Sequence, residues 1–229
     1  MNIKAVITGD IVHSEQIALE HRGTLISTLR DVVAELQPLS PMQMEMFRGD
    51  SFQIVVERPE TSMTIATMVR AGLKAHSPGS GKSMWDARVS VGIGTTDYLG
   101  YGIVTSDGEA FRLSGRGLDA MGKSRLAAST RWHGVNEELP VGLAFADDLI
   151  THWSVGQAKT VYLSVAMGLS QSEIARATAT SQQNVSKTLA AARESLLTLF
   201  LNRFTTIVNN HNYNEYTYSG KVACSPSDG

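Results

Sequence analysis

Two aspartates at the ends of short apolar runs are the residues best suited to chemistry. Asp10 follows the β-rich run Ala-Val-Ile-Thr at residues 5–8, and Asp50 lies in a turn at residues 48–51. In that turn Gly49 supplies backbone freedom, and alternating apolar residues follow it with the period of a strand. Each aspartate alone is also typical of a turn or a helix cap. Their shared Gly-Asp context favours a paired role.

Two carboxylates at the ends of adjacent buried strands repel each other, and such a pair usually ionises fully only around a divalent cation. We therefore predict that Asp10 and Asp50 hold Mg²⁺ or Mn²⁺. The turn between two core strands is also well placed for phosphate, so Arg48 and Gly49 are candidate nucleotide-binding residues.

Two arginines form a second candidate group. Arg112 and Arg116 are four residues apart in the segment GEAFRLSGRGLDAM at residues 108–121, so they share one face of the expected helix. A solvated helix face is the alternative interpretation of the pair. Glycines inside this helix weaken it by roughly 1 kcal/mol each, so close packing or a ligand should justify them.

The elements that must position these residues follow one another in a simple order. We expect a strand at residues 3–8, a helix at about 15–36, a hairpin around residue 50, a helix from Thr61 or Ser62, a strand at 87–94, a helix at 108–121 and a last strand at 124–129. This order predicts an α+β fold with a ferredoxin-like, palm-type β-α-β-β-α-β domain. In such a sheet the first strand lies beside the hairpin, which brings Asp10 and Asp50 together.

Composition describes an ordinary globular chain. It has 229 residues, 42% hydrophobic and 18% charged, and a net charge of −2. The lone cysteine, Cys224, excludes an internal disulfide and favours a reducing cytoplasm. No apolar run approaches the roughly 20 residues of a membrane span, so no membrane partner is expected. Residues 1–150 carry 14 basic and 18 acidic side chains (net −4), whereas residues 151–205 carry 5 and 2 (net +3), which suggests two domains.

The C-terminal part has the pattern of an all-α helix-turn-helix domain. Ser170 and Glu173 form a capping box, a turn follows at residues 179–180, and Ser181 can cap a second helix. When the apolar side of that helix is buried, four polar residues point outward, of the types that contact bases and phosphates in the major groove. They are Gln182, Gln183, Ser186 and Lys187. A helical hairpin that serves only dimerisation is the alternative.

Three resemblances refine these predictions. The stretches ITGDIV, RGDSFQ and SGRGLD resemble those of the SatD family. More distantly, Asp10-Ile11-Val12, Gly49-Asp50, Gly92-Ile93 and the spacing of Arg112 and Arg116 are similar to the catalytic domain of class III nucleotidyl cyclases and diguanylate cyclases. Residues 169–189 resemble the helix-turn-helix of sigma-factor region 4.

The cyclase resemblance implies two metals on Asp10 and Asp50, assisted by the backbone of Ile11. It also implies a bound nucleoside triphosphate and a catalytic role for Arg116 with Arg112. Two positions depart from the pattern. Arg112 stands where the cyclases have Asn, and an arginine accepts no hydrogen bond. Met46 stands where adenylyl cyclases have a base-selecting Lys. These departures favour binding over turnover.

The sequence thus predicts a cytoplasmic, DNA-binding regulator whose palm domain (1–134) binds a nucleotide with a divalent metal. A helical domain (135–208) would bind double-stranded DNA, and a disordered tail (209–229) would follow. A homodimer is expected, with the last helix, rich in Leu and Phe up to Phe204, as its seam. The alternative is a metal-dependent nucleotidyl cyclase or nucleotidyltransferase whose helical domain serves assembly or autoregulation. A structural protein that uses a degenerate palm only to dimerise is a third, weaker reading.

Overall fold

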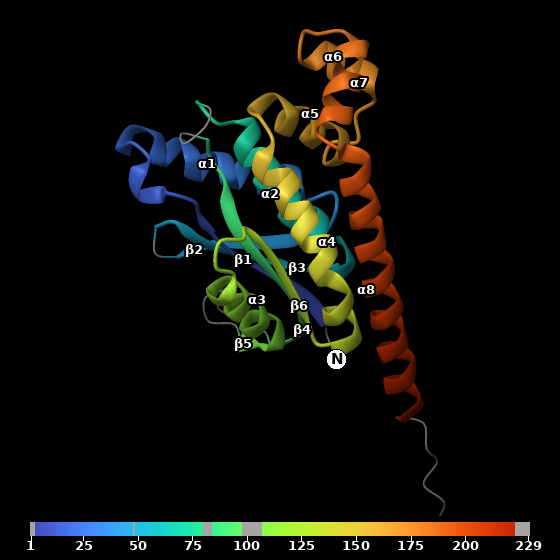
Figure 1. Cartoon of the computed structure of the whole chain (residues 1–229). Coiled ribbons are helices and arrows are strands. Elements are labelled where there is room, and N and C mark those ends of the chain that lie inside the picture. The colour runs from blue at the N-terminus through green and yellow to red at the C-terminus, as the bar shows by residue number, and fades with distance from the viewer. Residues whose placement is uncertain (1–2, 48, 80–83, 98–106, 223–229) are drawn as a thin grey trace, which may run out of the picture.

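Strand β1 (Ile3–Ile11) is the centre of the sheet. The computed structural model describes residues 3–47, 49–79, 84–97 and 107–222, and places two antiparallel strands on the flanks of β1 (Figure 1). Ile7 lies opposite Ile54 on one side and Val91 on the other. Within the described residues the sheet contains β2 (Met42–Phe47), β3 (Ser51–Val56), β4 (Ala87–Asp97), β5 (Asp107–Gly108) and β6 (Leu126–Thr130) besides β1.

The strand order β2-β3-β1-β4 and the helices between these strands confirm the predicted α+β fold of β-α-β-β-α-β type. The final strand, expected at residues 124–129, is β6, which pairs in parallel with β4. The expected helix at 15–36 is shorter, because a 3₁₀ turn at Ser14–Gln16 precedes α1 (Leu19–Glu35). Helix α2 (Ser62–Ala75) begins without the expected side-chain cap, since the hydroxyls of Thr61 and Ser62 donate to carbonyls of the preceding turn.

Helices cover both faces of the sheet. Alternate residues of β1 point to opposite sides: Ala5 and Ile7 join the large core beneath α1 and α2, whereas Val6 packs on Ala110 and Phe111 of α3 (Glu109–Ala120). A side chain at Gly92 would clash with the α3 backbone, so this glycine allows α3 to lie directly on β4.

The C-terminal helices pack against the palm rather than standing apart from it. Helix α4 (His133–His152) contacts β6, α5 (Val155–Val165) packs on α2, and the Tyr162 hydroxyl donates to Glu35 of α1 at 2.6 Å. One hydrophobic cluster runs from the sheet through these helices. The division of the chain at residue 134 therefore stays a prediction, with a shared core across it.

The last three helices are α6 (Gln171–Ala177), α7 (Gln182–Ala191) and α8 (Glu194–Val222). Residues 209–222, expected to be disordered, continue α8 instead, because extending an existing helix costs much less than nucleating one. Across the part of the chain that the structure describes, no helix combines the length and apolar character needed to cross a bilayer.

Candidate functional site

The edge of the sheet where β1 ends and β3 begins, which we call the strand-end edge, brings together the two segments that carry the predicted aspartates. Asp10 lies directly opposite Ser51 in the β1–β3 ladder. The next residue, Ile11, donates its backbone N–H to the carbonyl of Asp50 at 3.1 Å. Gly49 has a φ of 80°, a left-handed conformation that suits the turn. Arg48 lies outside the described residues. The palm topology thus places Asp10 and Asp50 at one edge.

Asp10 already has a cationic partner that the sequence analysis missed. Arg88 lies opposite Asp10 in the β1–β4 ladder. Its Nε donates to Oδ1 at 2.9 Å and its Nη2 to Oδ2 at 2.7 Å, which makes a bidentate pair. These hydrogen bonds, with a further contribution from Asp119, raise the pKa of the Arg88 guanidinium. The alternation along residues 87–94 was the available signal, because it places Arg88 on the face opposite Val89 and Val91.

Asp50 has a different environment. Its Oδ2 accepts a hydrogen bond from the Ser14 hydroxyl at 2.7 Å, and its Oδ1 accepts a longer one from Ser51 at 3.4 Å. It lines a cavity of about 320 Å³ that also contacts Ile11, Ser14 and Arg22. No ion pair to Asp50 occurs among the described residues. Its carboxylate therefore keeps its charge available to a ligand in this cavity.

The donor set fits one divalent cation better than two. Mg²⁺ commonly takes one or two carboxylates and completes its shell with phosphate oxygens and water. Asp50 can supply such a ligand, whereas the charge of Asp10 is balanced by Arg88. Within the described residues no group of three or more His, Cys, Asp or Glu side chains gathers for a metal. A site on Asp50 would thus depend on ligands that a phosphate brings.

The two arginines of α3 point to solvent. Arg112 pairs with Asp107 at 2.9 Å, and Arg116 donates to the carbonyl of Arg112 at 3.2 Å. Their helix buries its other side through residues such as Ser114, whose hydroxyl shares a buried hydrogen bond of 2.8 Å with Thr8. No hydrogen bond or ion pair in the described part of the chain joins either arginine to the aspartates. Within one chain the predicted site is therefore incomplete on this side.

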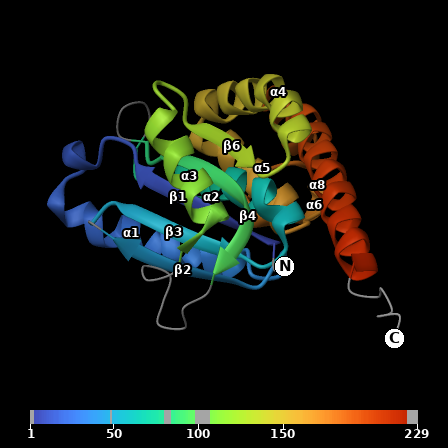
Figure 2. The ribbon, with the colours of Figure 1, turned by 90° about the horizontal axis from the view of Figure 1, so that it is seen from below.

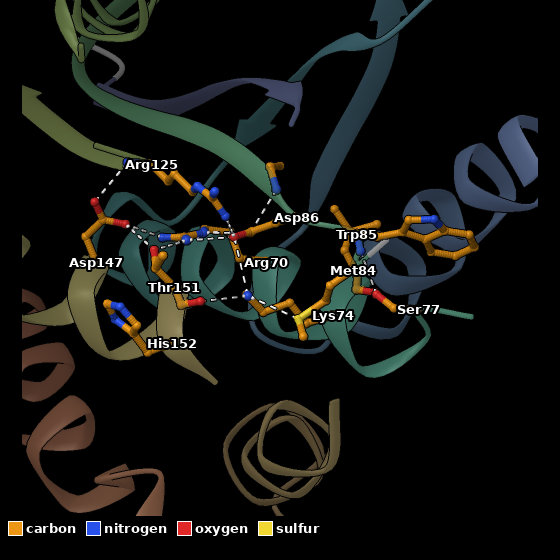
Figure 3. A network of polar contacts seen from close by, with 12 residues as sticks. Arg70, Lys74, Ser77, Met84, Trp85, Asp86, Arg125, Asp147, Thr151 and His152 are labelled. Atoms are coloured by element: carbon orange, nitrogen blue, oxygen red, sulfur yellow. Dashed lines mark hydrogen bonds and ion pairs between the residues drawn. The ribbon is translucent and has the colours of Figure 1, made fainter. Parts of the chain in front are cut away.

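A buried ionic network lies next to the strand-end edge (Figure 3). Arg70 of α2 is fully buried and donates to both carboxylate oxygens of Asp86 at 3.0 Å and to Asp147 of α4 at 2.7 Å. Arg125 donates to Asp86 at 2.8 Å, and Lys74 lies 3.6 Å from it. The network joins α2, α4 and the segments before β4 and β6.

Burial and the neighbouring charges in this network shift the pKa values of Asp86 and Lys74. Burial alone would raise the pKa of the Asp86 carboxyl, but Arg70, with Lys74 and Arg125, holds this pKa below its ordinary value. Burial lowers the pKa of the Lys74 ammonium, and Asp86 offsets only part of this effect. The backbone carbonyl of Asp86 accepts a hydrogen bond from Val12 at 2.9 Å. The network therefore abuts the segment that carries Asp10.

Helices α5, α6 and α7 form a compact three-helix unit at one end of the molecule (Figure 1). The expected capping box of Ser170 and Glu173 is present, and Ser181 caps α7 by accepting from the N–H of Asn184. The turn between α6 and α7 contains Ala179 with a φ of 50°. Helices α6 and α7 pack against each other and against α5, and their assignment as a helix-turn-helix stays a prediction.

The solvent-facing side of α7 carries the residues expected to contact DNA. Val185 and Leu189 are buried toward the other helices. The four residues expected to contact DNA are all exposed: Gln182, Gln183, Ser186 and Lys187. The face is therefore free for a macromolecule to approach.

The sequence matches no protein-family model and no curated protein sequence. Similar solved structures include the dimeric guanylyl cyclase domain of the RhoGC fusion protein from Blastocladiella emersonii (13% identity, TM-score 0.41, 52% of this chain and 75% of that chain). They also include the GGEEF domain of a diguanylate cyclase from Vibrio cholerae (17%, 0.40, 58% and 85%). A bacterial light-regulated adenylyl cyclase is a third (13%, 0.44, 61% and 79%). Identities and TM-scores this low do not establish a family or a function for this chain. The resemblances to the SatD family and to sigma-factor region 4 therefore stay predictions.

Proposed function

We propose that this protein is a DNA-binding regulator whose palm binds a nucleotide together with a divalent cation. The observation that carries the DNA-binding part is the exposed polar face of α7, a helix capped at its start by Ser181 and held on its other side by Val185 and Leu189. A rigid helix with a free polar face is the part that helix-turn-helix proteins insert into the major groove.

The residues of this face divide by chemistry. Gln182 and Gln183 carry amides that can donate to and accept from base edges, and Ser186 can do either. Lys187 is a point charge suited to a phosphate. Because the helical part carries only a small positive excess, we expect modest affinity from one copy and a palindromic or repeated target for a dimer.

The palm supports nucleotide binding more than turnover. Asp50 faces a cavity that also contacts Arg22, so a cation on Asp50 and a phosphate beside it would balance each other's charge. Ile11 could add its backbone carbonyl, and Gly49 and Arg48 stand at the adjoining turn. Arg88 satisfies Asp10, which leaves a two-metal centre short of one carboxylate. We therefore favour Mg²⁺ or Mn²⁺ as a partner of a bound triphosphate.

Electrophoretic shifts over a salt series, on genomic fragments flanking the protein's own gene, test the DNA-binding proposal. Lys187→Ala should weaken binding about equally on all fragments and reduce the salt slope by roughly one charge. Gln183→Ala should cost about 1–3 kcal/mol on the preferred fragment only. Lys159→Ala, which removes an exposed lysine from α5, is the matched control and should bind as the wild type does. No shift at low salt, with or without nucleotide, would contradict the proposal.

The enzyme alternative has its own readout. The exposed positions of Arg112 and Arg116 leave them free to complete the site of a second chain, which is the observation in its favour. We expect slow or no cyclic product from ATP or GTP with Mn²⁺, because Met46 and Arg112 depart from the cyclase pattern. If chromatography shows robust formation of a cyclic product, and this activity is lost in Arg116→Ala, the enzymatic role replaces the binding role.

A further inference from the structure

An apolar surface remains uncovered on the outer side of α4 and α8. Four large side chains there are more than half exposed: Val141 at 68%, Phe145 at 70%, Leu196 at 56% and Leu199 at 68%. Phe145, Leu196 and Leu199 line a groove of about 510 Å³ between the two helices, and Val141 lies one turn before Phe145 on α4. Figure 2 shows α4 and α8 side by side along one flank of the molecule. We call this surface the α4–α8 face.

The two helices run antiparallel, so the exposed residues can be assigned to levels along the face. Trp153 donates its indole N–H to the carbonyl of Ala192 at 2.9 Å. At the other end, Glu138 pairs with Arg203 at 2.7 Å. Between these two contacts, Gly142 lies against the Phe200 ring. The apolar residues of both helices thus share the central levels.

Most of the apolar stripe of α8 is used within the chain. Leu197, Leu201 and Phe204 are buried against the palm and α4. The stripe that the sequence suggested as a dimer seam is therefore mainly intramolecular. The apolar residues of α8 that remain exposed to a partner are Leu196 and Leu199. They join the exposed Val141 and Phe145 of α4.

Charges at the ends of the face are complementary between the two helices. The exposed side of α4 carries Glu137, Glu138 and Asp148, whereas Arg203 and, just before α8, Arg193 are exposed on the other side. The contacts between α4 and α8 place Asp148 at the level of Arg193 and Glu138 at the level of Arg203. A second copy turned by a two-fold axis along the helices would set the acidic α4 of one chain beside the basic α8 of the other.

We propose that the α4–α8 face binds a second copy of this chain and forms a two-fold symmetric four-helix bundle. Each α4 then has an antiparallel α8 on both sides, one from its own chain and one from the partner, which is the arrangement of up-down bundles. The face is about 30 Å long, from the 20 residues of α4, and about 20 Å wide. Two such faces bury about 1,200 Å², the lower end of the range for stable interfaces.

The size of this interface predicts a concentration-dependent dimer. This assembly does not depend on the proposed function, although it would turn both α7 helices toward the same end of the bundle. Sedimentation velocity should give twice the chain mass of 24.7 kDa at high concentration. Phe145→Glu with Leu199→Glu should raise the dimer dissociation constant at least about 100-fold, because each apolar side chain is replaced by a charge.

Matched variants separate this effect from a general change in charge or folding. Phe145→Leu should keep the dimer, and so should Ala120→Glu with Ala177→Glu, which adds the same charge at exposed positions on α3 and α6. Circular dichroism should show the same helix content in all variants. A wild type that stays monomeric at about 100 μM, or a dimer that survives the double glutamate change, would overturn the proposal.

A charge exchange tests the pairing of α4 with the partner's α8. Asp148→Arg alone and Arg193→Asp alone each place like charges across the interface, and each should weaken the homodimer about 10-fold. When the two variants are mixed, one contact has both charges reversed and the other is native, so heterodimers should form with wild-type affinity. If the mixture dissociates as readily as either variant alone, the proposed geometry is wrong.

Discussion

The two charge clusters beside the end of β1 differ in burial and in connectivity. At the strand-end edge, the Asp10–Arg88 pair is partly exposed, with side-chain exposures of 25% and 34%. In the buried network, the Arg70 and Asp86 side chains are only 0% and 2% exposed, and their other partners lie on α2, α4 and the segment before β6. Water can replace a lost partner in the first cluster but does not reach the Arg70–Asp86 pair at the centre of the second. The edge can therefore exchange partners, whereas the buried network fixes the fold.

Removal of the central carboxylate of the network should have the largest effect. Asp86→Ala leaves Arg70 buried without its bidentate partner, which we expect to lower the free energy of unfolding by about 3–5 kcal/mol. Urea denaturation at pH 7 measures it. Asp31→Ala, on the exposed side of α1, is the control and should change stability by less than about 0.5 kcal/mol. Equal effects of the two changes would show that burial does not distinguish the sites.

Acid should weaken the network before other parts of the buried core. Because the pKa of Asp86 is held below its ordinary value in the folded state, its contribution is present above the ordinary carboxyl pKa of about 3.9 and is lost as the pH falls through the folded-state pKa. Wild type should therefore lose more stability between pH 5 and pH 2 than Asp86→Asn does. Urea midpoints across this range compare them, and parallel curves would contradict the assignment.

The strand-end edge should respond in binding rather than in stability. Asp10→Asn and Asp50→Asn should each change the free energy of unfolding by no more than about 1 kcal/mol, since both side chains are partly exposed. Asp50→Asn should remove the Mg²⁺- or Mn²⁺-dependent rise in melting temperature that a bound nucleoside triphosphate produces, whereas Asp10→Asn should keep it because Arg88 already holds that side chain. Asp31→Asn is the matched control for the loss of one carboxylate. If Asp50→Asn keeps the full metal-dependent shift, the cation does not bind here.

Local pattern was sufficient for most of the fold. Period-2 alternation at residues 52–56 and 87–94, and the caps at Ser170 and Ser181, depend on neighbours in the sequence and were predicted from it. The partners of the charged residues could not be predicted in this way. Arg88 and Asp10 are far apart in the chain, and their pairing depends on the register of two strands. Arg70 and Lys74 lie in an otherwise apolar helix, which signals a buried counter-charge without identifying Asp86.

The extent of the site was also only partly predictable. The topology brought Asp10 and Asp50 to one edge, as expected, because strand order follows from element order. The outward direction of Arg112 and Arg116 depends on which side of α3 meets the sheet. That choice is made by the close approach of α3 to Gly92, a contact between distant segments.

The position of Asp147 in the buried network bears on how the chain is completed during synthesis. Arg70 is made early, yet one of its partners lies on α4, and Lys74 donates to the carbonyl of Thr151 near the end of that helix. A ribosome that has finished β6 still needs about 1–4 seconds to add the residues up to 151. Until then Arg70 lacks one of its two carboxylate partners, and Lys74 lacks a hydrogen-bond acceptor. The nascent palm should therefore remain loosely packed, and open to chaperones, until α4 has emerged.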